Sequence, residues 1–536
     1  MIKAAALSLA LISCLSATAV RADNDVGPSF AIKDYRFSGN TLLPQAQVEA
    51  LLEKFTNQAG NFDTIQEAVS ALEASYVLAG FGAVKVVLPE QDIEDGIIQL
   101  KIIEGQLGTI RVEGQKHFSE ENIRASLPGL REKQQPNMRD IDASLRVANE
   151  NSAKQTNLIF RQGAVLGEVD ALIRVADENP MRLAFSMDNT GVPGSDGEYS
   201  TGRYRTGFIL QHSNLFDLDH ALSFQYLTSP DHVDKVSIIG AGYRVPLYDL
   251  GDVLEFAFGY SNVDSGKITT AAGPIGISGS GQVYVFKYEQ FLPKLGDWQQ
   301  KLTYGLDYRI YTNSVKADSS NQSLVPDTTV HPISLSYTGN IRRDGGDFSS
   351  TLSYLHNIPG GADGTTEDFN RPGGRMGSTA NYQVWRYNLS ATQALFAGSF
   401  VKATFSGQYT RDALISGEQF GVGGLDSVRG FYERELSNDR GYRGGLELYS
   451  PELGSWSGQS DLRLRLLAFY EGAHLQRNKP LPGEQVNQNI ASVGLGLRAG
   501  YGKYANFRLD WGVVTNAGAS HQVGDHRLHG SFIGFF

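Results

Sequence analysis

Near its middle the chain reads Lys301-Leu302-Thr303-Tyr304-Gly305-Leu306-Asp307-Tyr308-Arg309-Ile310. The large apolar side chains of this segment stand at even positions, and its charged side chains stand at odd positions. Because successive side chains of a β-strand point to opposite faces of the sheet, the alternation predicts a strand with one apolar and one charged face. Such a strand suits either a soluble sandwich, where the apolar face packs on a core, or a membrane barrel, where it contacts lipid.

The same alternation recurs through the rest of the chain, from residue 181 to residue 536. We count about sixteen segments of this kind, including 401–409 and 507–513, at roughly 22 residues per strand and loop. Soluble sandwiches seldom reach this size without splitting. Residues 181–536 are therefore predicted to form a 16-stranded antiparallel transmembrane β-barrel. Its last strand ends on Phe536, with Phe532 on the same face, as is common in outer-membrane barrels, whose assembly machinery reads the terminal strand; the alternative is a stray hydrophobic tail.

The composition of the chain agrees with a barrel and argues against other classes of protein. Among its 536 residues are 60 Gly, 24 Tyr and 27 Phe, which barrels use in turns and in aromatic girdles. No run of 18 apolar residues occurs beyond the N-terminal segment, so helical membrane spans are not expected. The formal net charge of −11, with no basic patch, argues against binding of nucleic acid.

The first 22 residues (1–22) have the pattern of a secretory signal peptide. Lys3 gives a positive start, residues 4–15 form a short apolar core, and small residues up to Ala22 offer cleavage sites. Cleavage would also remove Cys14, the only cysteine. A second reading stays open, because residues 11–14 also resemble the cleavage box of a lipoprotein.

Residues 28–105 and 106–177 differ from the barrel region, because helical patterns alternate there with strands. In the first segment, a capping box at Thr64 is predicted to open the second helix. In the second segment, the residues around Gly114 repeat those around Gly39 at a distance of 75 residues. Each segment is predicted to be one α+β module of order β-α-α-β-β.

A repeat of this size directly before a barrel resembles the POTRA domain. Taken alone, the two segments fit equally well two small α+β modules without a special function. The first segment adds a glycine-aromatic turn, a proline corner and a later glycine that resemble the first POTRA domain of the two-partner secretion transporters. The residues that carry this resemblance are Gly80, Phe81, Pro89, Gln91 and Gly96.

A long stretch without a strand pattern, about residues 411–442, interrupts the barrel region. Loops of this length are usually functional or disordered, and this one is rich in glycine and aromatic residues. It contains Val428, Arg429, Gly430 and Phe431, which resemble the V-R-G-[YF] mark of the sixth extracellular loop in two-partner secretion and BamA-like proteins. The resemblance implies that the loop folds into the barrel and that Arg429 meets an acidic residue of the inner wall. The alternative is a glycine-rich surface loop with an ordinary arginine.

Strand parity offers an acidic residue for this role. The apolar side chains of the next predicted strand stand at even positions, so Glu471 shares the lumen-facing parity with Arg463 and Arg465. The family carries F-x-D-x-G on this strand, whereas this chain has Phe469-Tyr470-Glu471-Gly472-Ala473. A glutamate can still accept two hydrogen bonds from one arginine, so Arg429 and Glu471 are predicted to pair. In the alternative, Glu471 pairs only with Arg463 or Arg465.

Three segments near the start of the barrel region, 187–191, 202–205 and 214–216, also look like this family. One departure is the short segment before the first module. Many members carry a pore-plugging helix and a linker there, whereas only about six residues follow position 22 before the module begins here. No plug helix is therefore expected, and closure of the pore would depend on the long loop.

The sequence contains no nucleophile elbow, no paired Cys or His with metal spacing and no phosphate-binding loop. We expect neither enzymatic activity nor a cofactor or bound metal. The resemblance implies an outer-membrane pore of a Gram-negative cell that exports one large exoprotein, similar to a haemolysin or an adhesin. The periplasmic POTRA domains would bind the N-terminal secretion domain of this partner, and the barrel would translocate it. Its other contacts would be outer-membrane lipid and the barrel-assembly machinery.

Three other functions stay open at this point. A BamA-like factor that assembles or inserts outer-membrane proteins would have the same fold, although such factors usually carry three or more POTRA domains. A passive porin would lack the two modules. A surface receptor or an enzyme built on a barrel finds no supporting motif in the sequence.

Overall fold

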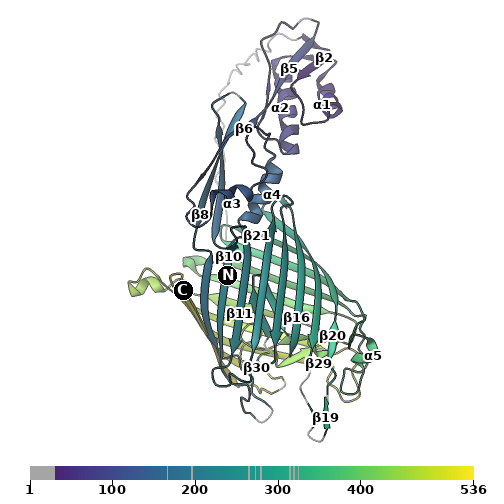
Figure 1. Cartoon of the computed structure of the whole chain (residues 1–536), viewed down its shortest axis with the longest axis vertical. Coiled ribbons are helices and arrows are strands. Elements are labelled where there is room, and N and C mark those ends of the chain that lie inside the picture. The colour runs from purple at the N-terminus through teal and green to yellow at the C-terminus, as the bar shows by residue number, and fades with distance from the viewer. Residues whose placement is uncertain are drawn as a thin grey trace, which may run out of the picture. The chain divides into compact units, whose positions relative to one another are not determined.

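The computed structural model describes residues 30–536 except 94, 166, 195–196, 264–265, 272, 278–279, 313–315, 318–319, 324 and 519. The expected signal peptide, including Cys14, and the short segment that follows it lie outside the described residues. The chain divides into two compact units, drawn in Figure 1. Unit 1 comprises residues 1–106 and 163–169, and unit 2 comprises residues 107–162 and 170–536.

Unit 1 contains the first module. Its strands are β1 (Phe30–Ile32), β2 (Asp34–Ser38), β3 (Gln58–Gly60), β4 (Val84–Val87) and β5 (Ile97–Glu104), and its helices are α1 (Gln45–Leu52), η1 (Glu53–Phe55) and α2 (Phe62–Ala79). The main sheet has the order β2-β5-β4, with β2 parallel and β4 antiparallel to β5, while β1 and β3 form a small separate sheet. The apolar face of α2 packs on the main sheet, where Leu72 and Ile98 are fully buried.

The structure corrects the predicted start of α2. Its N-cap is Asn61, whose side chain accepts a hydrogen bond from the Thr64 amide, while the Thr64 hydroxyl accepts one from the Asn61 amide. The capping box thus begins at Asn61 rather than at Thr64, because Asn caps a helix at least as well as Thr does. The helix ends at Gly80, whose φ of +103° is a left-handed conformation that suits glycine.

The second module has the same order of elements. It consists of β6 (Gln106–Glu113), α3 (Glu120–Ala125), α4 (Met138–Ala148), β7 (Lys154–Gln162) and β8 (Glu168–Asp177). Its sheet order β6-β8-β7 corresponds to the order β2-β5-β4 of the first module, with the last strand of each module in the middle. Both modules therefore show the predicted β-α-α-β-β arrangement.

The repeated glycines have the same structural task in both modules. Gly39 follows β2 with a φ of +87°, and Gly114 follows β6 with a φ of +95°. A Cβ atom on Gly39 would lie 2.2 Å from the carbonyl oxygen of Ile102, and one on Gly114 would lie 2.3 Å from that of Val175. A side chain is excluded at both positions, which explains why the sequence repeats there.

An acidic residue closes the loop after each of these glycines. Glu104, at the end of β5, accepts hydrogen bonds from the amides of Thr41 and Leu42. Asp177, at the end of β8, accepts them from the amides of residues 116–118. Burial tends to raise the pKa of the Asp177 carboxyl, but these three amides outweigh it and hold the pKa below its usual value. The two modules thus share their strand order and also an acidic side chain that holds the loop after the glycine.

The rest of unit 2 is a closed antiparallel barrel, which confirms the predicted 16-stranded architecture (Figure 1). Its strands are β9 (Met181–Asp188), β10 (Arg205–Leu215), β11 (His220–Thr228), β12 (Ile238–Leu247), β13 (Asp252–Ser261), β16 (Gly281–Leu295), β17 (Trp298–Tyr311), β20 (Thr328–Val330) with β21 (Pro332–Arg343), β22 (Gly346–Asn357), β23 (Gln383–Ala394), β24 (Phe400–Tyr409), β27 (Arg440–Tyr449), β28 (Leu462–Gln476), β29 (Asn487–Tyr501), β30 (Ala505–Asn516) and β31 (His526–Phe535). β20 and β21 form one strand interrupted at His331, because both pair with β17 in the same register.

Several short elements lie in the loops that join these strands. They are β14 (Gly266–Thr270), β15 (Gly273–Ile277), β18 (Lys316–Ala317), β19 (Ser320–Ser323), α5 (Thr366–Phe369), η2 (Phe396–Gly398), η3 (Ser416–Glu418), β25 (Phe420–Val422), β26 (Leu436–Asn438) and η4 (Gly454–Ser457). The loops at one end of the barrel are long, as in 358–382 and 410–439, whereas turns such as 248–251 and 296–297 at the other end are short.

The outer surface of the barrel is apolar. On β17, Tyr304, Leu306 and Tyr308 are 43%, 55% and 42% exposed, which places large apolar side chains where lipid surrounds a membrane barrel. The alternate residues face the lumen, where Lys301 forms an ion pair with Glu289 at 2.6 Å. Among the described residues, no helix is long and apolar enough to cross a membrane.

The last strand closes the barrel. β31 pairs with β9 over five residues, from Ser531 opposite Asp188 to Phe535 opposite Ala184. Phe532 lies on the outer face and is 39% exposed, and Phe536, just after the strand, is 84% exposed. Both aromatic rings are therefore accessible from outside the barrel.

Within unit 2, a buried ion pair joins the second module to the short-turn end of the barrel. Lys154 of β7 pairs with Asp219 in the β10–β11 turn, and both side chains are almost fully buried. Lys154 also donates to Asn122 of α3 at 3.1 Å, and Tyr248 of the next turn donates to Asp219. Burial lowers the pKa of the Lys154 ammonium although the nearby Asp219 carboxylate acts to raise it. The segment 214–216, singled out in the sequence, leads into this turn.

Replacement of Leu306 with Lys tests the lipid-facing assignment. A cation on the outer face near the middle of the bilayer should lower the free energy of unfolding by about 2–4 kcal/mol. The matched control is Thr303→Lys, on the lumen-facing parity of the same strand, which should change stability much less. Both are measured by urea titration of the barrel in lipid vesicles, with the gel mobility of the folded form as readout. Equal effects of the two substitutions would contradict the assignment.

Candidate functional site

The long loop of the barrel region runs from β24 to β27, over residues 410–439, and is called the lumen loop below. Its start agrees with the sequence prediction, but the predicted end at about 442 is too late, because β27 begins at Arg440. The loop also contains structure that the sequence pattern did not indicate. β25 and β26 form a short antiparallel hairpin, and η3 precedes them.

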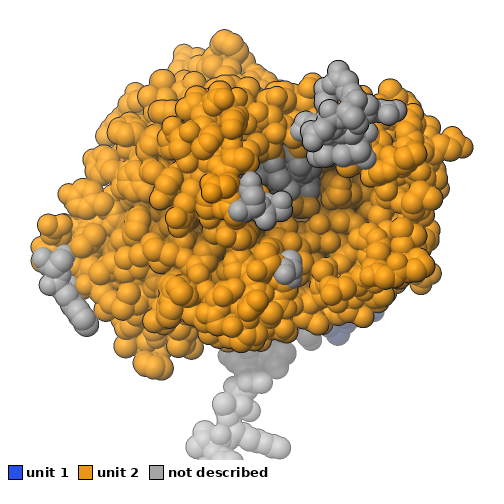
Figure 2. All heavy atoms as spheres, turned by 90° about the horizontal axis from the view of Figure 1, so that it is seen from below, with its two compact units in different colours: residues 1–106, 163–169 blue, residues 107–162, 170–536 orange. Residues whose placement is uncertain are grey.

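Apolar side chains hold the lumen loop against the inner wall of the barrel. Val428 and Phe431 are fully buried, and they pack in one cluster with Leu475 of β28, Ile490 of β29 and Val514 of β30. These wall residues come from three neighbouring strands. The loop is therefore folded into the lumen rather than extended from the barrel. Figure 2 shows unit 2 from the long-loop end.

Arg429 lies at the centre of this contact and has no exposed surface. Its Nε donates to Glu471 Oε1 at 3.0 Å, and its backbone amide donates to Glu471 Oε2 at 2.8 Å. Its Nη1 lies 3.2 Å from Asp510 Oδ1, and its Nη2 lies 2.7 Å from Glu447 Oε1. The guanidinium carbon also stands 3.5 Å from the ring centre of Phe469, in a cation–π contact.

The structure thus places Arg429 against Glu471, the residue that strand parity offered. The alternative partners Arg463 and Arg465 bind elsewhere. Arg463 donates to the carbonyl of Gly502 at 2.9 Å, and Arg465 donates to that of Ser450 at 2.7 Å. Both arginines therefore bind connections between strands rather than Glu471.

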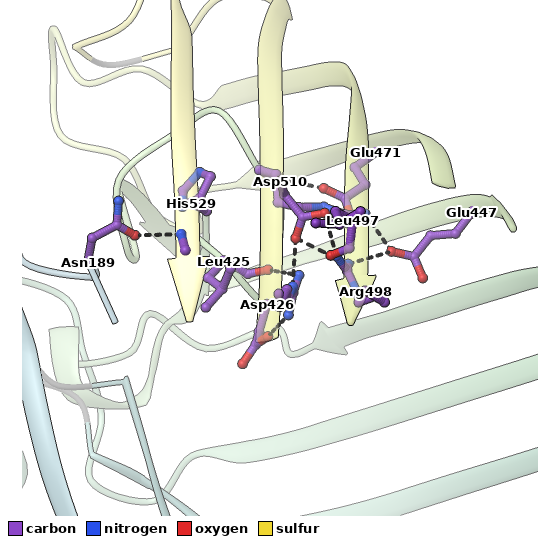
Figure 3. A network of polar contacts seen from close by, with 12 residues as sticks. Asn189, Leu425, Asp426, Glu447, Glu471, Leu497, Arg498, Asp510 and His529 are labelled. Carbon is purple, nitrogen blue, oxygen red and sulfur yellow. Dashed lines mark hydrogen bonds and ion pairs between the residues drawn. The ribbon is translucent and has the colours of Figure 1, made fainter. Parts of the chain in front are cut away.

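Two further arginines share the carboxylates of this site. Arg498 of β29 and Arg508 of β30 bind Asp510 at 2.9 and 2.6 Å. Arg508 also pairs with Asp426 of the lumen loop at 2.7 Å. Figure 3 shows these groups gathered on neighbouring strands, with Glu471, Asp510 and Arg498 directed toward one another. Opposite charges alternate through the network, so that each buried charge has a partner.

Sequence reasoning missed Glu447 and Asp510, although a usable signal was present. Asp510 stands between the outward-facing Leu509 and Trp511, and Glu447 stands between Leu446 and Leu448. The same parity rule that selected Glu471 therefore places both carboxylates in the lumen.

Gly512 and His529 are two further residues that the sequence did not indicate. A Cβ atom on Gly512 would lie 2.7 Å from the amide nitrogen of Gly430, so only a glycine lets the loop approach the wall so closely. Gly430 itself has a φ of +96°. Its amide donates to His529 Nε2 of the last strand at 3.0 Å. The V-R-G-F motif is thus held on this wall by contacts of its backbone as well as by the ion pairs of Arg429.

The motif residues of the first module shape its loops. The side chain of Gln91 accepts from the Gln99 amide at 2.7 Å and donates to the Gln99 carbonyl at 2.9 Å, as a neighbouring strand would. It also donates to the carbonyl of Pro89 at 3.3 Å. Gly96 has a φ of +74°, and a Cβ atom there would lie 2.3 Å from the carbonyl oxygen of Ala31.

The aromatic residue of the motif continues the end of α2. The Phe81 amide donates to the carbonyl of Tyr76 at 2.9 Å, directly after the helix ends at Gly80. Gly80, Phe81, Pro89, Gln91 and Gly96 therefore stabilise the loops of the module.

The described part of the chain contains no group of three or more His, Cys, Asp or Glu placed to hold a metal ion. The site around Arg429 is built from ion pairs that attach the lumen loop to the wall of the barrel.

Substitution of Arg429 by Met should loosen the lumen loop. The variant keeps a long side chain but leaves Glu471 without its main partner, and such charge-assisted bonds favour the bound loop on the order of tenfold or more. Chymotrypsin should therefore cut the folded variant within residues 410–439 much faster than the parent. Arg463→Met serves as control, because it removes a lumen-facing arginine of β28 that binds the Gly502 carbonyl instead of the lumen loop. Equal protease resistance of the three folded proteins would show that Arg429 does not hold the loop.

Comparison with known proteins identifies the family. The model of the haemolysin secretion/activation protein ShlB/FhaC/HecB family matches residues 167–499, and that of the ShlB-type POTRA domain matches residues 30–105. The outer membrane transporter CdiB of Dickeya dadantii is 25% identical and covers 86% of this chain and 79% of its own length. The heme/hemopexin transporter protein HuxB of Haemophilus influenzae is 22% identical, over 83% of this chain and 76% of its own length.

Solved structures agree on the fold. CdiB from Escherichia coli superposes with a TM-score of 0.74 at 20% identity, over 96% of this chain and 92% of that one. CdiB from Acinetobacter baumannii gives a TM-score of 0.67 at 16% identity, over 95% and 90%. Since a family model matches more than half of the chain, this protein belongs to the haemolysin secretion/activation protein ShlB/FhaC/HecB family.

Proposed function

We propose that this outer-membrane transporter exports one large partner exoprotein, similar to a haemolysin or an adhesin, from the periplasm to the cell surface. The domains would be a cleaved signal peptide (1–22), two periplasmic POTRA domains (28–105 and 106–177) and the barrel (181–536). The observation that carries the proposal is the lumen loop, which is folded into a wide barrel and attached there by ion pairs around Arg429.

A barrel of sixteen strands is wide enough to enclose an aqueous channel. Charged side chains such as Lys301 and Asp510 line this lumen, so an extended polypeptide could replace water along it. The lumen loop occupies part of the space, and displacement of the loop would open a path. Attachment by ion pairs suits such a movement because the separated charges can be solvated by water in the lumen.

The first POTRA domain would recognise the partner through a sheet edge. β4 is an edge strand in the order β2-β5-β4, and edge strands can pair with an added strand. The amide of Val86 on β4 already donates to Glu73 Oε1 of α2 at 3.0 Å. A strand from the N-terminal secretion domain of the exoprotein would therefore have to take the place of this carboxylate.

No enzymatic step and no cofactor is part of this proposal. The other contacts proposed for the chain are outer-membrane lipid around the apolar outer face and, during biogenesis, the barrel-assembly machinery. The accessible rings of Phe532 and Phe536 on the last strand would form the signal that this machinery reads.

A BamA-like assembly factor is the alternative function. The fold alone permits it, because BamA from Haemophilus ducreyi superposes with a TM-score of 0.50 at 14% identity. The ShlB-type POTRA match and the two modules, where assembly factors usually carry three or more, favour export.

Deletion of the gene separates the two functions. If the chain exports one exoprotein, the deletion strain should lose that protein from the surface while its outer-membrane protein profile stays normal. The Arg429→Ala variant should insert normally but restore export poorly, whereas the parent gene restores it fully. Surface export that continues in the deletion strain would refute the proposal, and a general loss of barrel proteins would favour the assembly factor.

A further inference from the structure

A second buried charge of the lumen loop lies away from Arg429. Glu418, the last residue of η3, is 1% exposed although it carries a carboxylate. A buried carboxylate is expensive unless it is paired and hydrogen-bonded, so its surroundings should show what it does.

Glu418 is bound by the barrel wall on both oxygens. Arg309 of β17 donates from Nη1 to Oε1 at 2.8 Å, and Arg386 of β23 donates from Nη2 to Oε2 at 3.2 Å. The hydroxyl of Tyr311 also donates to Oε1, at 2.7 Å. The Glu418 backbone is held as well, because Gln408 of β24 donates to its carbonyl at 3.0 Å.

The two attachments of the loop use different parts of the barrel. Arg429 binds carboxylates on β27, β28 and β30, whereas Glu418 binds arginines on β17 and β23. β17 and β30 are eight positions apart in the ring of sixteen strands, whereas β23 and β27 are separated by β24 alone. The lumen loop is therefore attached at two different parts of an arc of wall that runs from β17 to β30.

The signs of the charges are reversed between the two ends. The loop contributes a cation, Arg429, to three carboxylates of the wall and an anion, Glu418, to two arginines of the wall. The attachments of Arg429 and Glu418 have no side chain in common, so the ion pairs of one can separate without breaking those of the other. A cavity of about 430 Å³ remains in the lumen, lined on one side by Arg309 and Arg386 and elsewhere by Asp426 of the loop. The wall arginines that bind Glu418 thus line this cavity.

We propose that Glu418 is a second, independent anchor of the lumen loop, a positioning residue that keeps the transporter closed together with Arg429. The inference rests on the proposed export function, in which the loop must move. Opening of the lumen then requires that both anchors separate. Loss of either anchor removes one of these two attachments, while Asp426 still pairs with Arg508 and Asp439 with Arg375.

Channel recordings of the full-length protein in planar lipid bilayers test the proposal without any exoprotein. Glu418→Gln keeps the volume of the side chain but removes its charge, and it should raise the time spent in the open state on the order of tenfold. Glu418→Asp keeps the charge and should return most of the closed state, which a purely structural role would not explain. Arg386→Gln weakens the same anchor from the wall, and it provides the measurement if the Glu418→Gln variant fails to insert.

A matched control uses a glutamate that also has two arginine partners. Glu484, in the loop between β28 and β29, binds Arg477 at 2.6 Å and Arg375 at 3.5 Å. Glu484→Gln should change the open time much less than Glu418→Gln does, because Glu484 binds Arg375 and Arg477 outside the lumen loop and Arg375 keeps its pair with Asp439 of the loop.

Independence of the anchors is tested by combining Glu418→Gln with Arg429→Met. Independent contributions multiply, so the double variant should be open on the order of a hundredfold longer than the parent. A double variant that is no more open than Arg429→Met alone, or Glu418→Gln recordings identical to those of the parent, would overturn the second anchor. Neither result depends on export, which the gene deletion tests separately.

Discussion

The positive charge of Arg429 is removed from water inside a barrel, and the surrounding structure is arranged to compensate it. An isolated buried guanidinium would destabilise the protein strongly, so its position requires carboxylates at hydrogen-bonding distance. Glu471 supplies two oxygens, and Glu447 and Asp510 supply one each. These carboxylates would repel one another if Arg429 withdrew, but Arg498 and Arg508 remain beside Asp510. The wall is therefore stable with the loop present and is still partly neutralised without it.

The two-residue period of the strands makes this arrangement possible. Lipid excludes charge from one face of each strand, so the charges of the barrel region collect on the other face, where they meet in the lumen. On β17 the same rule sets Tyr304, Leu306 and Tyr308 toward lipid and directs Asp307 and Arg309 inward. A loop that enters such a lumen finds polar partners on every side. Its own charges then decide where it is held.

The part of the site that follows from strand period could be predicted from the sequence, and the part that follows from packing could not. Parity pointed to Glu471, and it would have pointed to Asp510 as well. It has no bearing on Glu418, since that residue lies in a loop whose path no periodicity describes. The alternation of side chains does not predict the role of Gly512 either, because that role depends on how closely the backbone of Gly430 approaches it. In the first module, the repeated Gly39 was found because the same steric demand occurs twice, whereas the helix start was misplaced because Asn61 and Thr64 are both good caps.

A loop that closes a channel must be firmly held and yet removable, and ion pairs meet both demands better than apolar packing does. Formation of a buried pair gains Coulomb energy but loses the hydration of both groups, so its net contribution to stability is small. Withdrawal of the intact loop into a wet lumen returns that hydration to both partners. Truncation of one partner leaves the other buried and unpaired in the closed state. A single substitution therefore destabilises the closed state by more than the net contribution of the ion pair. The apolar cluster of Val428 and Phe431 packs the loop against the wall, and the ion pairs of Arg429 and Glu418 attach it at two different parts of that wall.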